Sequence, residues 1–158
     1  MTHVIDVSTP RDREIRVTRE FDAPRSLIFA CHTKPELVRR WLLGSPGWTM
    51  PVCEIDLRVG GGYRYVRRND ADGRDVRMDG EHREIVASER VVTIERFDGG
   101  EALCTLALAE QGGRTTLTHT MLFATPESGD QARQSGMTDG MGASYDGLEK
   151  LIAEQKVG

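Results

Sequence analysis

The chain has 158 residues, the usual length of one domain and enough to bury a substantial core. Its formal net charge is −4, with 21 basic against 25 acidic residues. A weakly acidic chain lacks the concentrated basic face that nucleic-acid phosphates or an anionic membrane surface attract. The sequence contains no run approaching 18 apolar residues, and residues 1–13 lack the apolar core of a signal peptide. The composition predicts a globular protein with no nucleic-acid partner and no membrane insertion.

The 3 cysteines are odd in number and widely spaced, which fits neither a disulfide framework nor a zinc site: Cys31, Cys53 and Cys104. We expect them to behave as small buried hydrophobes in a reducing cytoplasm. The 4 histidines are also dispersed, so the spacing predicts no metal site, and the sequence indicates no cofactor.

The expected elements begin after a loose leader, residues 1–13, and a single domain is expected over residues 14–155. Apolar residues alternate over residues 14–21, which predicts a half-buried strand. Pro24 then favours the first turn of a short helix. Thr33 and Glu36 have the capping-box spacing, which predicts a second short helix.

Alternation returns in six further segments, near residues 53–59, 63–65, 76–83, 91–97, 104–108 and 117–123. Short turns separate these segments, so the predicted sheet is antiparallel. Residues 60–62 are three glycines followed by an alternating strand. A helix N-terminus that could hold a phosphate is therefore not expected there, and a bulge that bends the sheet is the favoured interpretation.

From about residue 129 to residue 155 the apolar period becomes helical, which predicts one helix of about 40 Å. Four glycines interrupt it: Gly136, Gly140, Gly142 and Gly147. Each costs about 1 kcal/mol relative to alanine in a helix interior. Close approach to the sheet, or a gap left for a ligand, would explain why they are present.

Several segments in this order resemble one family. They are Phe21–Arg25, Thr33–Glu36 before Trp41, Asp56–Gly61 before Tyr63 and Arg64, Gly80 with Arg83–Val86 and Glu89–Val92, Leu117–His119, and Gly136–Leu148. Together they are similar to the heat-shock-protein-90 ATPase activator-like family of the START-related, helix-grip superfamily. Ala87-Ser88 departs from a common proline pair, and Gly142-Ala143 departs from a common tryptophan.

The resemblance implies an α+β helix-grip fold. A curved seven-stranded antiparallel sheet would surround the long C-terminal helix, with two short helices after the first strand. It also implies a cavity between helix and sheet. Methionine and aromatic side chains suit a pocket for a small molecule. The residues that we expect to face it are Tyr63, Tyr65, Met78, His82, His119, Met121, Phe123, Met137, Met141 and Tyr145. The alternative is that these side chains simply fill the core.

Three functions follow as hypotheses. The preferred one is a module that binds a lipid or another small apolar or amphipathic molecule. The second, implied by the resemblance, is a co-chaperone-like or stress-response protein that contacts the chaperone. The third is a cyclase- or hydrolase-type enzyme that uses His82 or His119 as a general base. No nucleophile motif surrounds Ser135 or Ser144, so no catalytic residue is assigned. A homodimer is compatible with the pattern.

Overall fold

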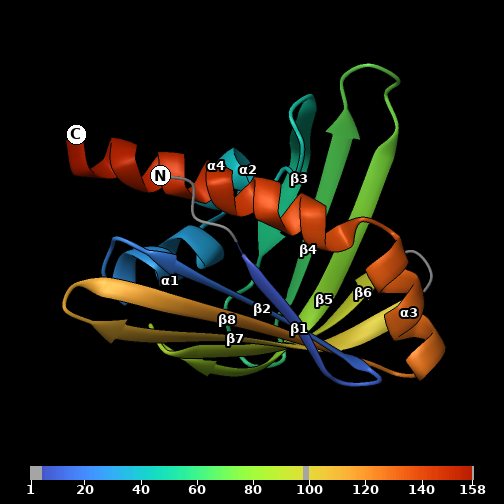
Figure 1. Cartoon of the computed structure of the whole chain (residues 1–158). Helices are drawn as coiled ribbons and strands as arrows, with labels where there is room; N and C mark the ends of the chain where they lie inside the picture. Colours follow the sequence, from blue (N-terminus) through green and yellow to red (C-terminus); the bar gives the residue numbers. More distant parts are fainter. Residues whose placement is uncertain (1–4, 98–99, 158) are drawn as a thin grey trace.

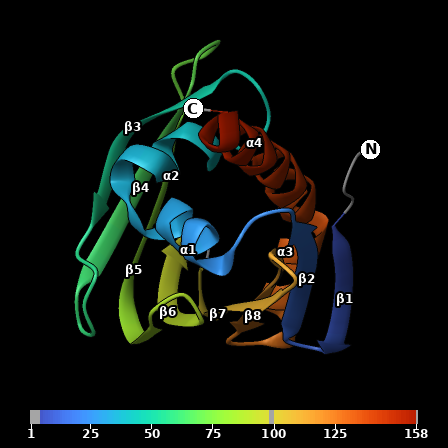
Figure 2. The ribbon, with the colours of Figure 1, turned by 90° about the vertical axis from the view of Figure 1, so that its left-hand side faces the viewer.

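The sheet is the central feature of the computed structural model, which describes residues 5–97 and 100–157. Its eight strands are antiparallel in the order β1-β2-β8-β7-β6-β5-β4-β3. The strands are β1 (Asp6–Arg11), β2 (Glu14–Phe21), β3 (Trp48–Ile55), β4 (Gly62–Asn69), β5 (Asp75–Val86), β6 (Arg90–Phe97), β7 (Gly100–Gln111) and β8 (Arg114–Phe123). The sheet curves strongly, and its concave face encloses the helices (Figures 1 and 2).

Four helices complete the fold: α1 (Arg25–Thr33), α2 (Pro35–Trp41), α3 (Pro126–Gln134) and α4 (Met137–Val157). α1 and α2 connect β2 to β3, and α4 lies across the open side of the curved sheet (Figure 2). The predicted α+β helix-grip fold is therefore confirmed. Three details of the prediction are not.

The sheet has eight strands and not seven, because Asp6–Arg11 forms β1 beside β2. Val7 pairs with Val17, yet its side chain is 46% exposed. An edge strand held by backbone hydrogen bonds leaves no buried apolar face in its sequence, so periodicity could not reveal it. The first part of the expected leader, residues 1–4, lies outside the described residues.

The expected single terminal helix is two helices, which are separated at Ser135 and Gly136. Gly136 has a φ of +83°, in the left-handed region that glycine tolerates best. α3 begins earlier than expected, at Pro126, where the Thr125 hydroxyl accepts a hydrogen bond of 3.1 Å from the Ser128 amide. The Thr125 cap and Pro126 are signals for a helix start. The prediction used the apolar pattern alone, which does not include them.

The expected capping box is absent from the described structure of α2. Thr33 is the last residue of α1, and its hydroxyl donates to the Phe29 carbonyl at 2.9 Å. α2 instead starts with Pro35 at its first position, and no side chain caps it. Proline supplies the helical φ there and removes an amide that would otherwise need a partner.

Gly60 and Gly61 form the expected bulge, at the turn between β3 and β4. The Gly60 amide donates to the His82 carbonyl at 2.8 Å, and the His82 amide donates to the Gly61 carbonyl at 2.9 Å, so two residues oppose one. Gly60 has a φ of +86°, and a Cβ on Gly61 would lie 2.3 Å from the Asp56 carbonyl oxygen. Further register shifts of this half of the sheet lie between Thr49 and Val52 and between His82 and Glu84.

The buried apolar residues form two separate clusters. The larger one joins β2, β7 and β8 to α1 and α4, with Ile15, Phe21, Leu117 and Leu148 among its members. The smaller one joins α2 to β3 and consists of Val38, Met50 and Cys53. The interior is thus divided, and the strands between the two clusters are β4, β5 and β6.

Candidate functional site

A polar row crosses the concave face where the two clusters separate. Tyr63 on β4 pairs with Gly80 on β5, and Gly80 pairs with Glu95 on β6. The Tyr63 hydroxyl reaches over Gly80 and donates to Glu95 Oε1 at 2.9 Å. A Cβ on Gly80 would lie 2.5 Å from the Tyr63 hydroxyl oxygen. The hydrogen bond therefore depends on the missing side chain of Gly80.

Glu95 is the acceptor of this row. Burial raises its pKa, while the Tyr63 hydrogen bond and the charge of Arg67 act in the opposite direction. Burial, followed by the charge of Glu95, raises the pKa values of Tyr63 and Cys104. The Cys104 thiol lies 3.9 Å from Glu95 Oε2. Tyr63 and Cys104 thus stay protonated at neutral pH, and Glu95 is left as the only acidic acceptor among the three.

His82 lies beside this row, two residues further along β5 and on the same face. It pairs with Thr93 on β6, and its ring centre is 5.4 Å from that of Tyr63. Its Nδ1 is 3.1 Å from the Gly61 carbonyl oxygen. A carbonyl oxygen only accepts, so Nδ1 carries the proton in this contact. The histidine is buried and anchored to the β3–β4 turn.

A histidine pair occupies the other side of the interior. Burial, and then the charge of His32, lowers the pKa of His119 to about 4. Burial also lowers the pKa of His32 to about 4, although its contact with the Ile28 carbonyl acts in the opposite direction. His32 meets Trp41 edge-on at 4.8 Å. Both imidazoles are therefore neutral at pH 7 and can donate or accept hydrogen bonds.

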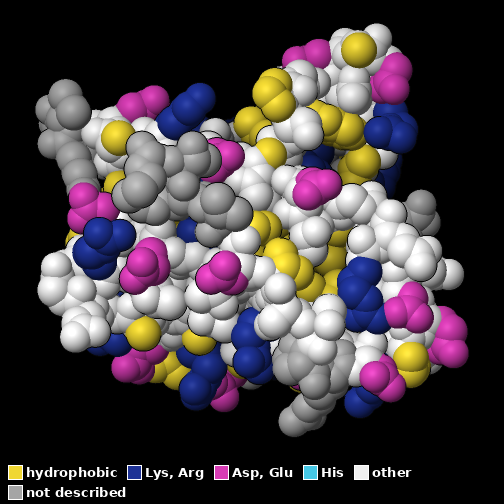
Figure 3. All heavy atoms as spheres, in the orientation of Figure 1, with side chains coloured by type: hydrophobic (Ala, Val, Ile, Leu, Met, Phe, Trp, Pro, Cys, Tyr) yellow, Lys and Arg dark blue, Asp and Glu magenta, His cyan; other side chains and the backbone are white. Residues whose placement is uncertain are grey.

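Several inward-facing apolar side chains keep exposed surface. Tyr65 packs against the smaller cluster, while Phe97, Met137 and Met141 pack against the larger one, and all four are half-buried. Met78 pairs with both Tyr65 and Phe97 and is also half-buried. Figure 3 shows hydrophobic side chains at the opening between α4 and the hairpin of β4 and β5. These side chains therefore border a space that solvent reaches.

α4 leaves room over this space at its first turns. Its second half is buried at Leu148, Leu151 and Ile152, whereas Met137 and Met141 are half-buried. A Cβ on Gly140 would find nothing within 4 Å. Open space therefore surrounds this position, and close approach of another element does not explain Gly140.

The other helix glycines have other uses. A Cβ on Gly147 would lie 3.4 Å from the Trp41 carbonyl oxygen, so this glycine allows α2, and not the sheet, to approach α4 closely. A Cβ on Gly142 would meet Ile5 at 3.5 Å. Gly142, at the position where many relatives have a tryptophan, therefore faces the N-terminal segment.

The predicted site residues divide into two groups. The structure brings Tyr63, Tyr65, Met78 and His82 together on β4 and β5, with 5.2 Å between the two tyrosine ring centres. The remaining six are His119, Met121, Phe123, Met137, Met141 and Tyr145.

The remaining group is mixed. Met121 and Phe123 are core members, and Tyr145 stacks on Trp41 at 5.9 Å. For these three the packing interpretation fits best. His119, Met137 and Met141 are half-buried and face the interior.

Sequence reasoning missed Glu95, the central residue of the polar row. Its alternation partners, Val91, Thr93 and Phe97, share its face of β6. A carboxylate at an inward position of an apolar strand was the available signal. Arg67 and His32 were missed in the same way, since both occupy positions next to buried neighbours.

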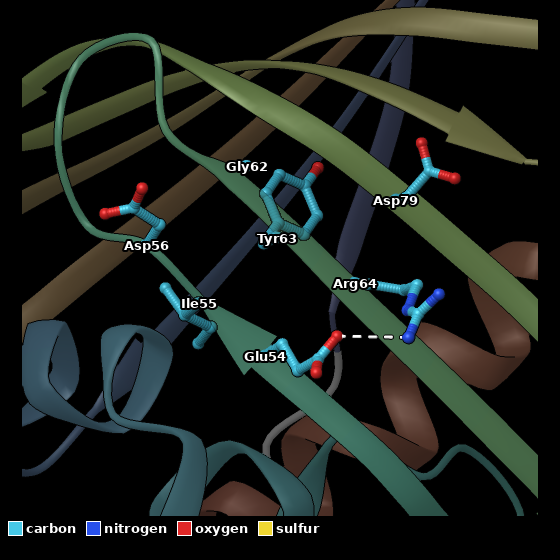
Figure 4. Close-up of a pocket in the computed structure, with 7 residues that line it drawn as sticks. All are labelled: Glu54, Ile55, Asp56, Gly62, Tyr63, Arg64 and Asp79. Carbon is cyan, nitrogen blue, oxygen red and sulfur yellow. Dashed lines mark ion pairs between the residues drawn. The ribbon is translucent and has the colours of Figure 1, made fainter.

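A hollow of about 620 Å³ lies over β3, β4 and β5 (Figure 4). It is lined by Glu54, Ile55, Asp56, Gly62, Tyr63, Arg64 and Asp79. Glu54 and Arg64 form an ion pair of 3.2 Å, and both side chains are more than half exposed. Exposed pairs of this kind contribute little free energy. The hollow resembles a charged surface more than an apolar binding site.

The sequence profile described as "Activator of Hsp90 ATPase homolog 1-like protein" matches residues 22–153. The chain belongs to this family. A search of curated protein sequences returned no match.

Solved structures of similar proteins agree with the family's fold. A crystal structure of a Rhodobacter sphaeroides protein is 28% identical, with a TM-score of 0.88 over 95% of this chain and 98% of that one. A Chromobacterium violaceum protein is 27% identical, with a TM-score of 0.77 over 87% and 96%. A Nitrosomonas europaea protein is 23% identical, with a TM-score of 0.84 over 95% and 100%.

One departure from the family pattern has a structural counterpart in this member. Ser88, at the position of the expected proline pair, has a φ of 62° in the turn between β5 and β6.

No described helix is long and apolar enough to cross a membrane. Within the described residues, no three His, Cys, Asp or Glu side chains gather closely enough to hold a metal ion.

Proposed function

We propose that this protein binds a small apolar or amphipathic molecule between the concave face of the sheet and the first half of α4. The observation that carries the proposal is the set of half-buried apolar side chains around this space: Tyr65, Met78, Phe97, Met137 and Met141. A pocket for a small molecule is typically apolar with a few placed polar groups. Glu95, His82 and His119 would be those groups.

The division of the core supports the proposal. Tyr65 belongs to the side of the smaller cluster, and Phe97 belongs to the side of the larger one. A ligand between them would contact both clusters. Each Å² of apolar surface that it buries would contribute roughly 25 cal/mol to the free energy of binding. Methionine, which is flexible and polarizable, adapts to ligands of different shape.

Nile red, an uncharged apolar dye without N–H or O–H donors, tests the proposal directly. We expect its fluorescence to rise on binding with a saturable, single-site titration. Gly140→Leu should fill the space under α4 and weaken dye binding at least tenfold. It should not unfold the protein, because nothing lies within 4 Å of the new Cβ. Ala153→Leu is the matched control, since it enlarges an exposed residue of the same helix.

Equal dye binding by the wild type, Gly140→Leu and Ala153→Leu would contradict a site under α4. The absence of dye binding by the wild type would favour a role in protein interaction, which the Hsp90 activator description of the family suggests. The rate of ATP hydrolysis by purified Hsp90, measured with and without this protein, examines that role. A cytoplasmic location is also proposed, and three free buried cysteines support it.

A further inference from the structure

The carboxylate of Glu95 has acceptor capacity that the described protein does not fill. Oε1 accepts from the Tyr63 hydroxyl at 2.9 Å. The contact of Oε2 among the described residues is the Cys104 thiol at 3.9 Å, and a thiol is a weak donor. A carboxylate offers about four lone-pair sites. Oε2 thus has lone pairs that no strong donor of the described protein fills.

The neighbours of Glu95 across the sheet have little side chain of their own, and the Tyr63 ring covers the side of Gly80. Glu95 pairs with Gly80 on one side and Ala102 on the other. These residues have no side chain or only a methyl group. Glu95 itself is half-buried, although burial is deep enough to raise its pKa. The unfilled oxygen therefore borders the same space as the half-buried apolar side chains.

The next row of the sheet is apolar and follows the polar row directly. It consists of Tyr65, Met78 and Phe97, which pair with one another across β4, β5 and β6. A ligand that fits both rows would have a polar end at the Glu95 acceptor and an apolar end on the next row. Neighbouring rows on one face are about 7 Å apart, the length of a small aromatic or aliphatic body.

Arg67 is the cation whose charge acts on Glu95, and its guanidinium is engaged elsewhere. Its guanidinium donates to the Leu43 carbonyl at 3.4 Å and lies 5.6 Å from the Trp48 ring centre. It stabilises the charge of Glu95 through space, while no hydrogen bond joins the two side chains among the described contacts.

We infer that the ligand is an apolar molecule with a hydrogen-bond donor, an alcohol or an amine, which donates to Glu95 while its apolar body lies on Tyr65, Met78 and Phe97. The inference rests on the proposed binding function and specifies its ligand class. An apolar carboxylic acid is disfavoured, because two carboxylates would repel each other in a site of low dielectric constant.

A matched naphthalene series tests the inference by displacement of Nile red. The four competitors are naphthalene, 2-naphthylmethanol, 2-naphthylmethylamine and 2-naphthoate. We expect the alcohol, the amine or both to compete at least tenfold better than the naphthoate and the parent hydrocarbon. The alcohol and amine arms separate a neutral donor from a cationic one. In Glu95→Gln the advantage over naphthoate should fall below about threefold, because a charge-assisted hydrogen bond is lost.

Glu101→Gln is the control, since it removes a carboxylate from the exposed face of the adjacent strand β7. It should leave the series unchanged. Tyr63→Phe gives a second measurement should Glu95→Gln fold poorly. It keeps the Glu95 carboxylate and frees Oε1, so the preference for a donor should persist or increase.

Two results overturn the inference while the binding function stands. One is Nile red binding to the wild type with naphthoate competing as well as the alcohol and the amine. The other is an unchanged series in folded Glu95→Gln. If neither Nile red nor any naphthalene binds to the wild type, the binding function itself fails, and this inference fails with it.

Discussion

Arg19 on β2 donates to Asp146 on α4 at 2.8 Å from a side chain that is only 1% exposed. Glu149, one turn further along α4, lies 3.4 Å from the same guanidinium. A charge placed on the concave face thus ties the middle of α4 to the sheet. Among the described residues, no ion pair joins the first turns of α4 to the sheet, and it is there that Met137 and Met141 stay half-buried. The ion pairs thus hold α4 at Asp146 and Glu149, and the space lies beside its first turns.

Removal of Asp146 should weaken this tie. Asp146→Ala is expected to lower the free energy of unfolding by about 1 kcal/mol, because Asp146 is half exposed and Glu149 still faces the guanidinium. Urea denaturation measures the loss. In an Arg19→Met background, which replaces the buried charge by an apolar side chain, the same change should cost almost nothing. Equal losses in both backgrounds would show that the two residues are not coupled.

Gly80→Ala should disrupt the polar row. The new Cβ would lie 2.5 Å from the Tyr63 hydroxyl oxygen and 2.5 Å from the Ile94 carbonyl oxygen. Overpacking of this kind costs about 1–3 kcal/mol. The measurement is again urea denaturation, with Gly140→Ala as the counterpart in a helix. The new Cβ at position 140 would find nothing within 4 Å, and the free energy of unfolding should rise by about 1 kcal/mol. A neutral effect of Gly80→Ala would mean that Tyr63 can leave Glu95 without cost.

The parts of the fold that bury one face of a strand or helix could be predicted from the sequence. Ile15, Val17 and Phe21 alternate and are fully buried on β2, as expected. β1 and the break at Gly136 could not be predicted from the same signal. An edge strand buries little apolar surface, and a left-handed glycine ends a helix without changing the apolar period around it.

The candidate site was predictable only where its residues are apolar or aromatic. Tyr63, Tyr65 and Met78 lie in alternating segments, and the structure brings them together. Glu95 and Arg19 are charged residues that the fold directs inward. Alternation places both on the apolar side of their strands. Charged residues usually face solvent, however, so alternation alone did not show that these two are directed into the interior.

Mild acid should destabilise the protein through the histidine pair. Burial lowers the pKa values of His32 and His119 from 6.5 to about 4 in the folded state. Between these values the unfolded chain binds protons that the folded chain does not. Stability therefore falls as the pH falls from about 6.5 to 4, by up to about 1.4 kcal/mol per pH unit for each histidine.

The histidine effect is measured by urea denaturation at several pH values in this window. His119→Gln cannot bind the proton, so its stability should depend less steeply on pH than that of the wild type. The exposed-face variant Glu101→Gln serves as a control for general charge effects. Identical slopes for the wild type and His119→Gln would contradict the assignment.

Glu95 should affect stability with the opposite sign. Burial raises its folded pKa above 4.5, so the folded state holds a proton that the unfolded state has already released. The stability that this carboxyl contributes is present at low pH and is lost as the pH rises through the folded pKa. Glu95→Gln carries no such charge and keeps an acceptor for the Tyr63 hydroxyl. Its stability relative to the wild type should therefore increase from pH 4 to pH 7, and parallel urea titrations at each pH measure the difference. A constant difference across this range would mean that Glu95 is as well solvated in the folded protein as in the unfolded chain. Water would then already fill the acceptor to which a ligand is proposed to donate.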